Sequence, residues 1–281
     1  MTHSIKYSVL KDGDRHLRGK IAEEIFERAK DMLFLGRELT LCKTHDLSYV
    51  LMGIPDSEVS KIITQYALGK DPLLLSYNEA EERINEFRKK LEISVREINI
   101  SELSSTRGIC ALCFGKGKFL VDGLYLDQAS YTFWLCGSCL EKCLQLGYIT
   151  GDKYNYTVKD KEFDDAMRNF IKAIFYLEKR DAFRVLSRLD ETSIEFLYEV
   201  YGGEKFNFFH GQWPFDYVAV DNDGKKYLID VTSVRGEYNP AGFSRREKEI
   251  AEQAKKVGFS ILVPVVKFLE DWQVVIELSE V

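Results

Sequence analysis

Five of the six cysteines, which lie between Cys110 and Cys143, have the residue type and spacing for metal chemistry. Four of them form two C-x-x-C pairs, Cys110 with Cys113 and Cys136 with Cys139. Each C-x-x-C turn directs two thiolates at one tetrahedral ion, so two turns supply the four ligands of a structural zinc site. Buried free cysteines, a redox pair and an iron–sulfur cluster are the alternatives. We expect Zn²⁺ at these four residues, and we expect Cys143 to pack as a small apolar side chain.

The segments around the two cysteine pairs are typical of a zinc finger. The first pair is followed by the glycine-containing segment FGKGKF, which favours a tight turn and a hairpin. The second pair opens the helix-like segment LEKCLQLGYI. A turn, a hairpin and a second pair at a helix start resemble the treble-clef zinc finger. The sequence therefore predicts a zinc-finger domain with four cysteine ligands over residues 101–155.

Two aspartates near the C-terminus indicate a second metal site. Asp216 opens one apolar strand and Asp230 closes the next, with the turn DNDG between them. In an antiparallel hairpin these two positions face each other, and two carboxylates can hold Mg²⁺ against a phosphate and lower the pKa of an attacking water. The alternative is that both are ordinary strand-end or turn residues. Because aspartate is depleted in strands and a buried carboxylate needs a partner or an ion, we favour the metal site.

The two aspartates lie in short motifs that resemble those of the PD-(D/E)xK nuclease superfamily. Pro214-Phe215-Asp216 is similar to the first motif, with Phe215 inserted, and Asp230-Val231-Thr232 is similar to the second. The elements expected over residues 191–281 are a helix, three strands, a helix and two strands. The resemblance implies a restriction-endonuclease-like α/β core that cuts DNA with Mg²⁺, in which Glu195 on the preceding helix supplies a third acid, with Glu191 as the rival.

One position departs from the superfamily pattern. The motif's lysine falls at Thr232, which projects to the same side as Asp230 but carries no charge. A basic residue on the following helix, Arg245, Arg246 or Lys248, is the expected replacement, and Lys248 is our catalytic candidate. The alternative function is a DNA-binding or regulatory protein that retains the nuclease fold but does not cut.

Residues 46–66 resemble a helix-turn-helix. A helix begins near Asp46, a turn follows at Gly53, and a second helix begins near Ser57. Tyr49 departs from the motif, which has a small residue at that position, and a plain helical hairpin is the alternative. The residues expected to reach the DNA groove are Ser57, Glu58, Ser60, Lys61 and Gln65.

Composition sets limits on the class of protein. The net charge of −6 and the isoelectric point near 5.5 argue against non-specific coating of nucleic acid. No apolar run approaches membrane-spanning length and no signal peptide opens the chain, so we expect a cytoplasmic location and no membrane partner. We expect an α+β multidomain, restriction-type DNA endonuclease that binds duplex DNA as a homodimer. Its expected domains are a helical region (1–100), the zinc finger (101–155), a helical connector (156–190) and the nuclease domain (191–281).

Overall fold

The computed structural model of the chain divides into two compact units. One unit, here called the sheet unit, comprises Met1–Leu68 and Asp181–Val281, and the other, the cysteine unit, comprises Gly69–Arg180. The described residues are 15–34, 37–98, 108–124, 131–153, 155–202, 214–234, 243–268 and 274–280. Both units contain helices and a mixed sheet, so the expected α+β class is confirmed.

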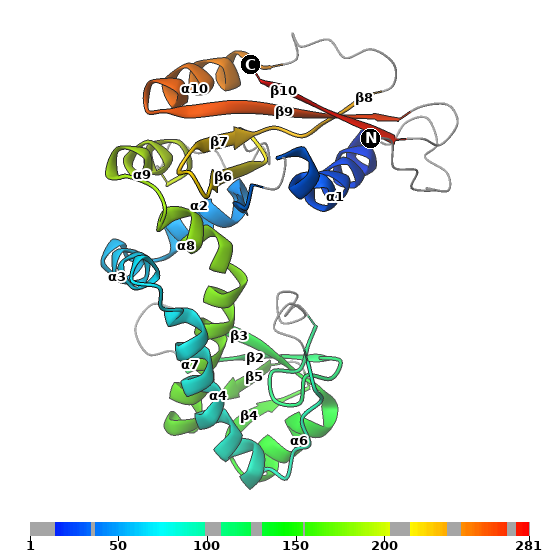
Figure 1. The fold of residues 1–281 in the computed structure, drawn as a ribbon. Coiled ribbons are helices and arrows are strands. Elements are labelled where there is room, and N and C mark those ends of the chain that lie inside the picture. Colours follow the sequence, from blue (N-terminus) through cyan, green and yellow to red (C-terminus); the bar gives the residue numbers. More distant parts are fainter. Residues whose placement is uncertain are drawn as a thin grey trace. The chain divides into compact units, whose positions relative to one another are not determined.

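The sheet unit is built on a six-stranded mixed sheet with the order β1-β6-β7-β9-β10, in which β8 also pairs with β9 (Figure 1). Its strands are β1 (Leu39–Lys43), β6 (Tyr217–Asp221), β7 (Lys226–Ile229), β8 (Thr232–Val234), β9 (Phe259–Phe268) and β10 (Val274–Glu280). The expected hairpin is confirmed, because β6 and β7 are antiparallel, and the expected crossover is confirmed, because β7 and β9 are parallel.

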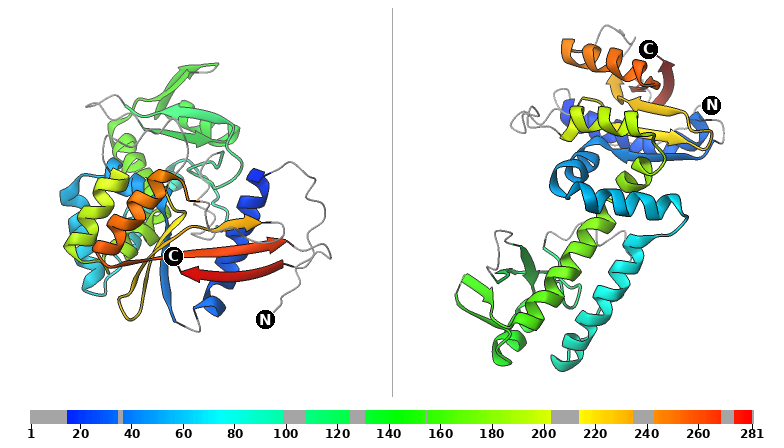
Figure 2. Two further views of the ribbon diagram at one scale, coloured as in Figure 1. Left: turned by 90° about the horizontal axis from the view of Figure 1, so that it is seen from above. Right: turned by 90° about the vertical axis from the view of Figure 1, so that its left-hand side faces the viewer.

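Two helices cover opposite faces of this sheet, α1 (Arg15–Leu33) and α10 (Arg245–Lys256) (Figure 2). The first turn of α10 is fixed by a capping box, in which the Ser244 hydroxyl accepts from the Glu247 N–H and the Glu247 carboxylate accepts from the Ser244 N–H. Two lysines in its last turn complement the helix dipole. These local signals explain why the charged segment that connects β8 to β9 forms a helix.

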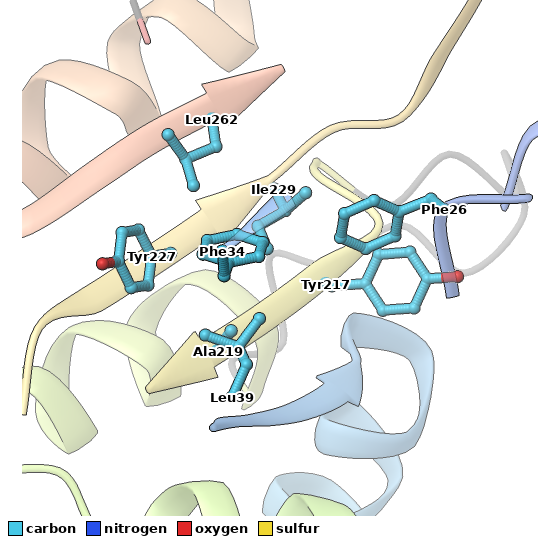
Figure 3. Packing of buried hydrophobic residues seen from close by; sticks show 8 residues of the cluster. All are labelled: Phe26, Phe34, Leu39, Tyr217, Ala219, Tyr227, Ile229 and Leu262. Atoms are coloured by element: carbon cyan, nitrogen blue, oxygen red, sulfur yellow. The ribbon is translucent and has the colours of Figure 1, made fainter. Parts of the chain in front are cut away.

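The core between α1 and the sheet is formed by large apolar and aromatic side chains (Figure 3). Phe26 from α1 packs on Tyr217 with ring centroids 5.5 Å apart, and Phe34 packs edge-on against Tyr227 at 5.7 Å. Alternation along β6 turns Tyr217 and Ala219 towards α1. The remaining members of this cluster are Leu39, Ile229 and Leu262. This packing holds α1 against the strand ends that carry the two aspartates.

The N-terminal segment does not form a separate helical region, which corrects the expected boundary at residue 100. Its helix α1 packs on the sheet, and its strand β1 pairs antiparallel with β6, so that Lys43 lies opposite Tyr217. The chain segment that separates β1 from β6 is long, and nothing local in the sequence reveals their pairing. The first of the three strands expected ahead of the second helix in residues 191–281 falls at residues 204–210, which lie outside the described residues.

Four shorter elements complete the described part of the sheet unit: α2 (Thr44–Gly53), α3 (Asp56–Ala67), α8 (Arg180–Leu186) and α9 (Glu191–Leu197), the last continued by a π-helical turn η1 (Tyr198–Gly202). The inner face of α2 is buried, and its Ser48 hydroxyl donates to the Tyr201 carbonyl at 2.7 Å. Helix α2 is therefore held against the η1 turn of the sheet unit.

The cysteine unit combines a four-stranded sheet with two long helices. The sheet has the order β3-β2-β5-β4. The elements are α4 (Pro72–Lys90), β2 (Phe119–Asp122), β3 (Thr132–Leu135), α6 (Gly137–Gln145), β4 (Ile149–Asp152), β5 (Asn155–Val158) and α7 (Lys161–Glu178). Helix α4 packs along α7 (Figure 1), so parts of the expected helical region and connector belong with the cysteines.

A buried arginine ties α4 to the first cysteine turn. Arg88 is 2% exposed, its guanidinium lies 4.7 Å from the centroid of the Phe114 ring, and it donates to the Ala111 carbonyl at 3.3 Å. A buried guanidinium needs such partners, because an unpaired charge in the core is costly. No helix in the described ranges is both long and apolar enough to cross a membrane.

Candidate functional site

The four paired cysteines come together as one group. Their sulfur atoms all lie within 4.8 Å of one another, and the Cys113 and Cys136 sulfurs are 3.7 Å apart. Four sulfurs at ~2.3 Å from a zinc ion are separated by about 3.8 Å, so this spacing fits the ion. Cys110 and Cys139 are buried, and the other two are half-buried. The structure therefore confirms that these four residues can bind a metal such as zinc.

The local elements place these sulfurs in the expected order of turn, hairpin and helix. In the first turn the Phe114 N–H donates to the Cys110 carbonyl at 2.8 Å, and Phe114 adopts a positive φ of 59°. Strands β2 and β3 form the hairpin, and Cys136 is the N-cap residue of α6 with Cys139 in the first helical turn. A helix N-terminus favours negative charge, which suits thiolate ligands.

The thiols of the metal-free protein cannot all be ionised together. A hydrogen bond from Cys139 lowers the pKa of Cys110 to about 5, while burial raises the pKa of Cys113 to about 11. The hydrogen bond to Cys110 also raises the pKa of Cys139. A divalent cation removes this mutual repulsion and releases protons as it binds. Cys143 is fully buried, burial raises its pKa to about 12, and it is not a member of the four-sulfur group.

The two aspartates form a second constellation, where β6 begins and β7 ends. Tyr217 pairs with Ile229, and Asp216 comes directly before β6 while Asp230 comes directly after β7, so the two aspartates lie at the same end of the hairpin. The Asp216 N–H donates to the Ile229 carbonyl at 2.8 Å, and its carboxylate accepts from the Val231 N–H at 2.7 Å. Both carboxylates are half-buried at the end of the ladder. The pair therefore lies at the end of the hairpin that is opposite the turn between β6 and β7.

Burial and mutual repulsion make this pair unfavourable without a cation. Burial, followed by the charge of Asp230, raises the pKa of Asp216 to about 7. Burial, followed by the charge of Glu247, raises the pKa of Asp230 to about 6, although a hydrogen bond from Thr232 at 3.5 Å opposes this rise. Carboxylates with raised pKa values at one strand end are typical of a functional site. A divalent cation between them would offset both effects.

The backbone beside Asp216 is held in an unusual conformation. Phe215, which is fully buried, has a positive φ of 65°, a region that bulky residues rarely adopt. The Tyr201 hydroxyl donates to the Pro214 carbonyl at 2.6 Å, and the Thr44 hydroxyl donates to the Phe215 carbonyl at 2.8 Å. The Thr44 N–H also donates to the Asp216 carbonyl at 3.0 Å. Such strain persists only where the surroundings fix it, and here it sets the direction of Asp216.

Two residues near Asp216 were not predicted from the sequence. The charge of Glu23 on α1 raises the pKa of Asp216, and the charge of Lys43 at the end of β1 lowers it. The Lys43 ammonium lies 3.6 Å from the Glu23 carboxylate and 3.3 Å from that of Glu27, which also accepts from the Tyr217 hydroxyl at 2.9 Å. The signal for these residues that the sequence offered was a pair of glutamates, Glu23 and Glu27, one turn apart on an amphipathic helix.

The other expected catalytic residues are not brought to the pair. Glu195 is exposed on α9, and Lys248 is exposed on α10; within the described ranges neither makes a hydrogen bond or ion pair with an aspartate. Arg245 pairs with Glu249 at 2.9 Å. Thr232 does lie beside Asp230, as predicted. The helix residue whose charge acts on Asp230 is acidic, namely Glu247 in the first turn of α10.

The candidate DNA-reading segment forms two consecutive helices, α2 and α3, joined at Ile54 and Pro55. Tyr49 is 40% exposed and packs edge-on against His45. Ser57, Ser60 and Lys61 are exposed, whereas Glu58 and Gln65 are half-buried. Three of the five groove candidates thus lie on the surface of α3, and a DNA-reading role stays a prediction.

Comparison of the chain with protein-family models, curated proteins and solved structures finds no match. The arguments on function therefore rest on the geometry of the two constellations. Among the described residues, the four cysteines are the only group of three or more metal-ligating side chains with ligand atoms within 4.8 Å of one another. The aspartate pair is a two-carboxylate arrangement, which suits an ion that keeps several waters.

The raised pKa values predict how stability depends on pH in the absence of Mg²⁺. Between about pH 4 and 7 the folded protein binds more protons at Asp216 and Asp230 than the unfolded chain does, so the free energy of unfolding falls as pH rises. We expect Asp216→Asn to be more stable than wild type at pH 8 by on the order of 1–3 kcal/mol, because one pKa unit corresponds to ~1.4 kcal/mol. Urea unfolding of the zinc-loaded proteins measures this difference.

The matched control for this measurement is Asp223→Asn, which changes an exposed turn residue of the same hairpin. We expect it to follow the wild-type pH dependence. Equal stability of Asp216→Asn and wild type at pH 8 would contradict the raised pKa of Asp216.

Proposed function

We propose that this chain is a Mg²⁺-dependent endonuclease of the restriction type that cuts duplex DNA at Asp216 and Asp230. The observation that carries the proposal is the position of these two half-buried carboxylates at the same end of the β6–β7 hairpin, where the charge of Asp230 acts on Asp216 and both pKa values are raised. Such a pair is stabilised by a divalent cation, which in turn can bind a phosphodiester oxygen.

The order of the surrounding elements supports the same proposal. A helix, four strands, a helix and two strands occur as α1, β1, β6, β7, β8, α10, β9 and β10. Apart from the three-residue strand β8, this is the order expected for a restriction-endonuclease-like core, with residues 44–216 inserted between its first two strands. The first helix and first strand of this core are α1 and β1, in place of the helix and strand expected after residue 190. They bring Glu23 and Lys43 to the site.

The donor set fits Mg²⁺, which binds through one or two carboxylates and keeps several waters. When bound, the ion would neutralise charge on the phosphate and lower the pKa of a water. Asp216 and Asp230 would hold it, and the Val231 N–H fixes the orientation of the Asp216 carboxylate. Glu23 replaces Glu195 as our candidate for the third acid, because its charge acts on Asp216.

Lys43 is our candidate for the cation that the motif lacks at Thr232. Burial by itself lowers the pKa of Lys43, but the charges of Glu27 and Glu23 raise it by more than burial lowers it. The net pKa is above the ordinary lysine value, so the ammonium stays charged at neutral pH. Its charge already acts on Asp216. A lysine here can stabilise negative charge that develops on a phosphate beside Asp216.

We expect Lys43→Met to slow DNA cleavage roughly 10-fold, which corresponds to ~1.4 kcal/mol of transition-state stabilisation. The effect is modest because Lys43 is 49% exposed and shares its charge with two glutamates. Single-turnover cleavage assays measure it. Lys43→Arg should recover most of the rate, and the exposed Lys256→Met should cleave like wild type. An unchanged rate in Lys43→Met would remove Lys43 from the site.

The cysteine unit and helix α3 are proposed to contact DNA outside the cutting site. If α3 reads bases, the double variant Lys61→Ala with Gln65→Ala should weaken binding to the preferred sequence by a few kcal/mol, at ~1–3 kcal/mol per base contact. Binding to unrelated duplex should change less. Competition binding measurements with the two duplexes distinguish these results, and equal affinity of variant and wild type would assign α3 to the scaffold.

The experiment that tests the proposed function is incubation of the purified chain with mixed duplex DNA and Mg²⁺ or Mn²⁺. Discrete double-strand breaks, absent without the divalent ion, are the expected result. A restriction-type enzyme also needs two sites for two strands, so we propose a homodimer on DNA.

The second candidate function is DNA binding without cleavage. It is favoured by the uncharged Thr232 and by Glu247, the acid whose charge acts on Asp230 where a basic residue was expected. Retarded DNA with no cut product under either metal ion would support it.

A further inference from the structure

A polar pocket of about 470 Å³ lies beside β1 in the sheet unit, away from the aspartates. Four parts of the chain line it: α1, β1 with the residue before it, α3, and α8 with the turn that follows. Three of its lining residues are cationic, namely Lys30, Arg184 and Arg188. The site described above uses none of these residues.

The charges in this pocket are only partly balanced. Arg184 lies 3.7 Å from Asp181, an exposed pair of little stability. Within the described part of the chain, Lys30 and Arg188 form no ion pair, and Glu38 is the other acid of the lining. Two cations thus remain available to an anion. Arginine in particular offers several N–H donors in a geometry that fits phosphate.

The main chain adds a donor to the pocket. Strand β1 is an edge strand, paired with β6. The Thr44 N–H points towards the β6 side, because it donates to the Asp216 carbonyl. Since successive N–H groups of a strand alternate in direction, the Leu41 N–H points to the free edge. Leu41 and Thr40 both line the pocket, so an anion there meets a main-chain donor and a hydroxyl as well as the two cations.

We propose that this pocket binds a backbone phosphate of the DNA, a short distance along the strand from the scissile bond. This inference rests on the proposed function. Leu41 lies three residues before Thr44, whose N–H donates to the Asp216 carbonyl, and three residues span ~10 Å along a strand. DNA carries one phosphate per ~3.4 Å of axis on each strand. The pocket therefore lies within a few nucleotides of Asp216. A phosphate held there would fix the register of the duplex on the cutting site.

The test uses Asp230→Asn protein, so that DNA stays intact, and measures duplex binding without Mg²⁺ by fluorescence anisotropy at about 50 to 200 mM salt. Adding Lys30→Gln and Arg188→Gln should weaken binding about 10-fold or more. It should also reduce the slope of log affinity against log salt by about 1–2, since each phosphate contact contributes ~0.9. The matched control adds Lys255→Gln and Lys256→Gln, two exposed lysines at the far end of α10.

Arg188→Lys, which keeps the charge, should bind more tightly than Arg188→Gln, and this pair of single variants carries the test if the double variant unfolds. Unchanged affinity and salt slope in the pocket variants would overturn the proposal. Thermal stabilisation of wild type but not of Arg188→Gln by inorganic phosphate, with equal DNA affinity, would assign the pocket to a free anion and would also overturn it. Cleavage by wild type with Mg²⁺ is scored separately, so a failure of the cutting function is distinguishable from a failure of this pocket.

Discussion

Asp230→Asn should cut duplex DNA at least ~100-fold more slowly than wild type while still binding it. The variant keeps the shape of the side chain and removes the negative charge that would hold Mg²⁺, and a bound metal supplies several kcal/mol of transition-state stabilisation. Binding without metal should be unchanged or tighter, because one carboxylate facing a phosphate is gone. Single-turnover cleavage and anisotropy on one labelled duplex measure both quantities.

Three companion variants sharpen this result. Asp216→Asn should show a similar loss, since the two carboxylates lie at the same end of the hairpin and the charge of Asp230 acts on Asp216. Glu195→Gln should cut at the wild-type rate, because Glu195 is exposed on α9 and makes no contact with the pair within the described ranges. Glu23→Gln should be slower than Glu195→Gln if the third acid comes from α1. Robust cleavage by Asp230→Asn would refute the assignment of the site.

The second large effect is expected from Cys110→Ser, which should release the zinc and loosen the cysteine unit. Cys110 is fully buried, and the Phe114 N–H that closes its turn donates to its carbonyl. Structural zinc binding contributes ~10–16 kcal/mol in small zinc-finger peptides, so its loss exceeds the stability of a typical domain. Metal analysis and limited proteolysis should show loss of zinc and cleavage within Gly69–Arg180, with the sheet unit spared.

Cys143→Ala provides the matched control for this change. Cys143 is equally buried and lies on the same helix as Cys139, but it is outside the four-sulfur group. It should retain one zinc per chain and resist proteolysis like wild type. Iron in place of zinc would favour the iron–sulfur alternative, and a purified wild-type protein with neither metal would contradict the site.

The cysteine set could be predicted from the sequence because its information is local. Two C-x-x-C turns, a glycine-containing hairpin and a helix start each depend on a few neighbouring residues, and the structure brings the four sulfurs together as expected. The hairpin of Asp216 and Asp230 was predictable for the same reason. A turn at DNDG between two apolar strands fixes the register, and the register places the two aspartates at the same end of the hairpin.

Tertiary structure alone decided what surrounds the aspartates. Glu23 and Lys43 reach Asp216 because β1 pairs with β6 across a long stretch of sequence, and an edge strand of five residues carries no signal for its partner. The strain at Phe215 likewise depends on Thr44 and Tyr201, which come from two other segments. Residue types and short spacings determined the ligands by themselves, whereas pairing between distant segments determined which charges act on them.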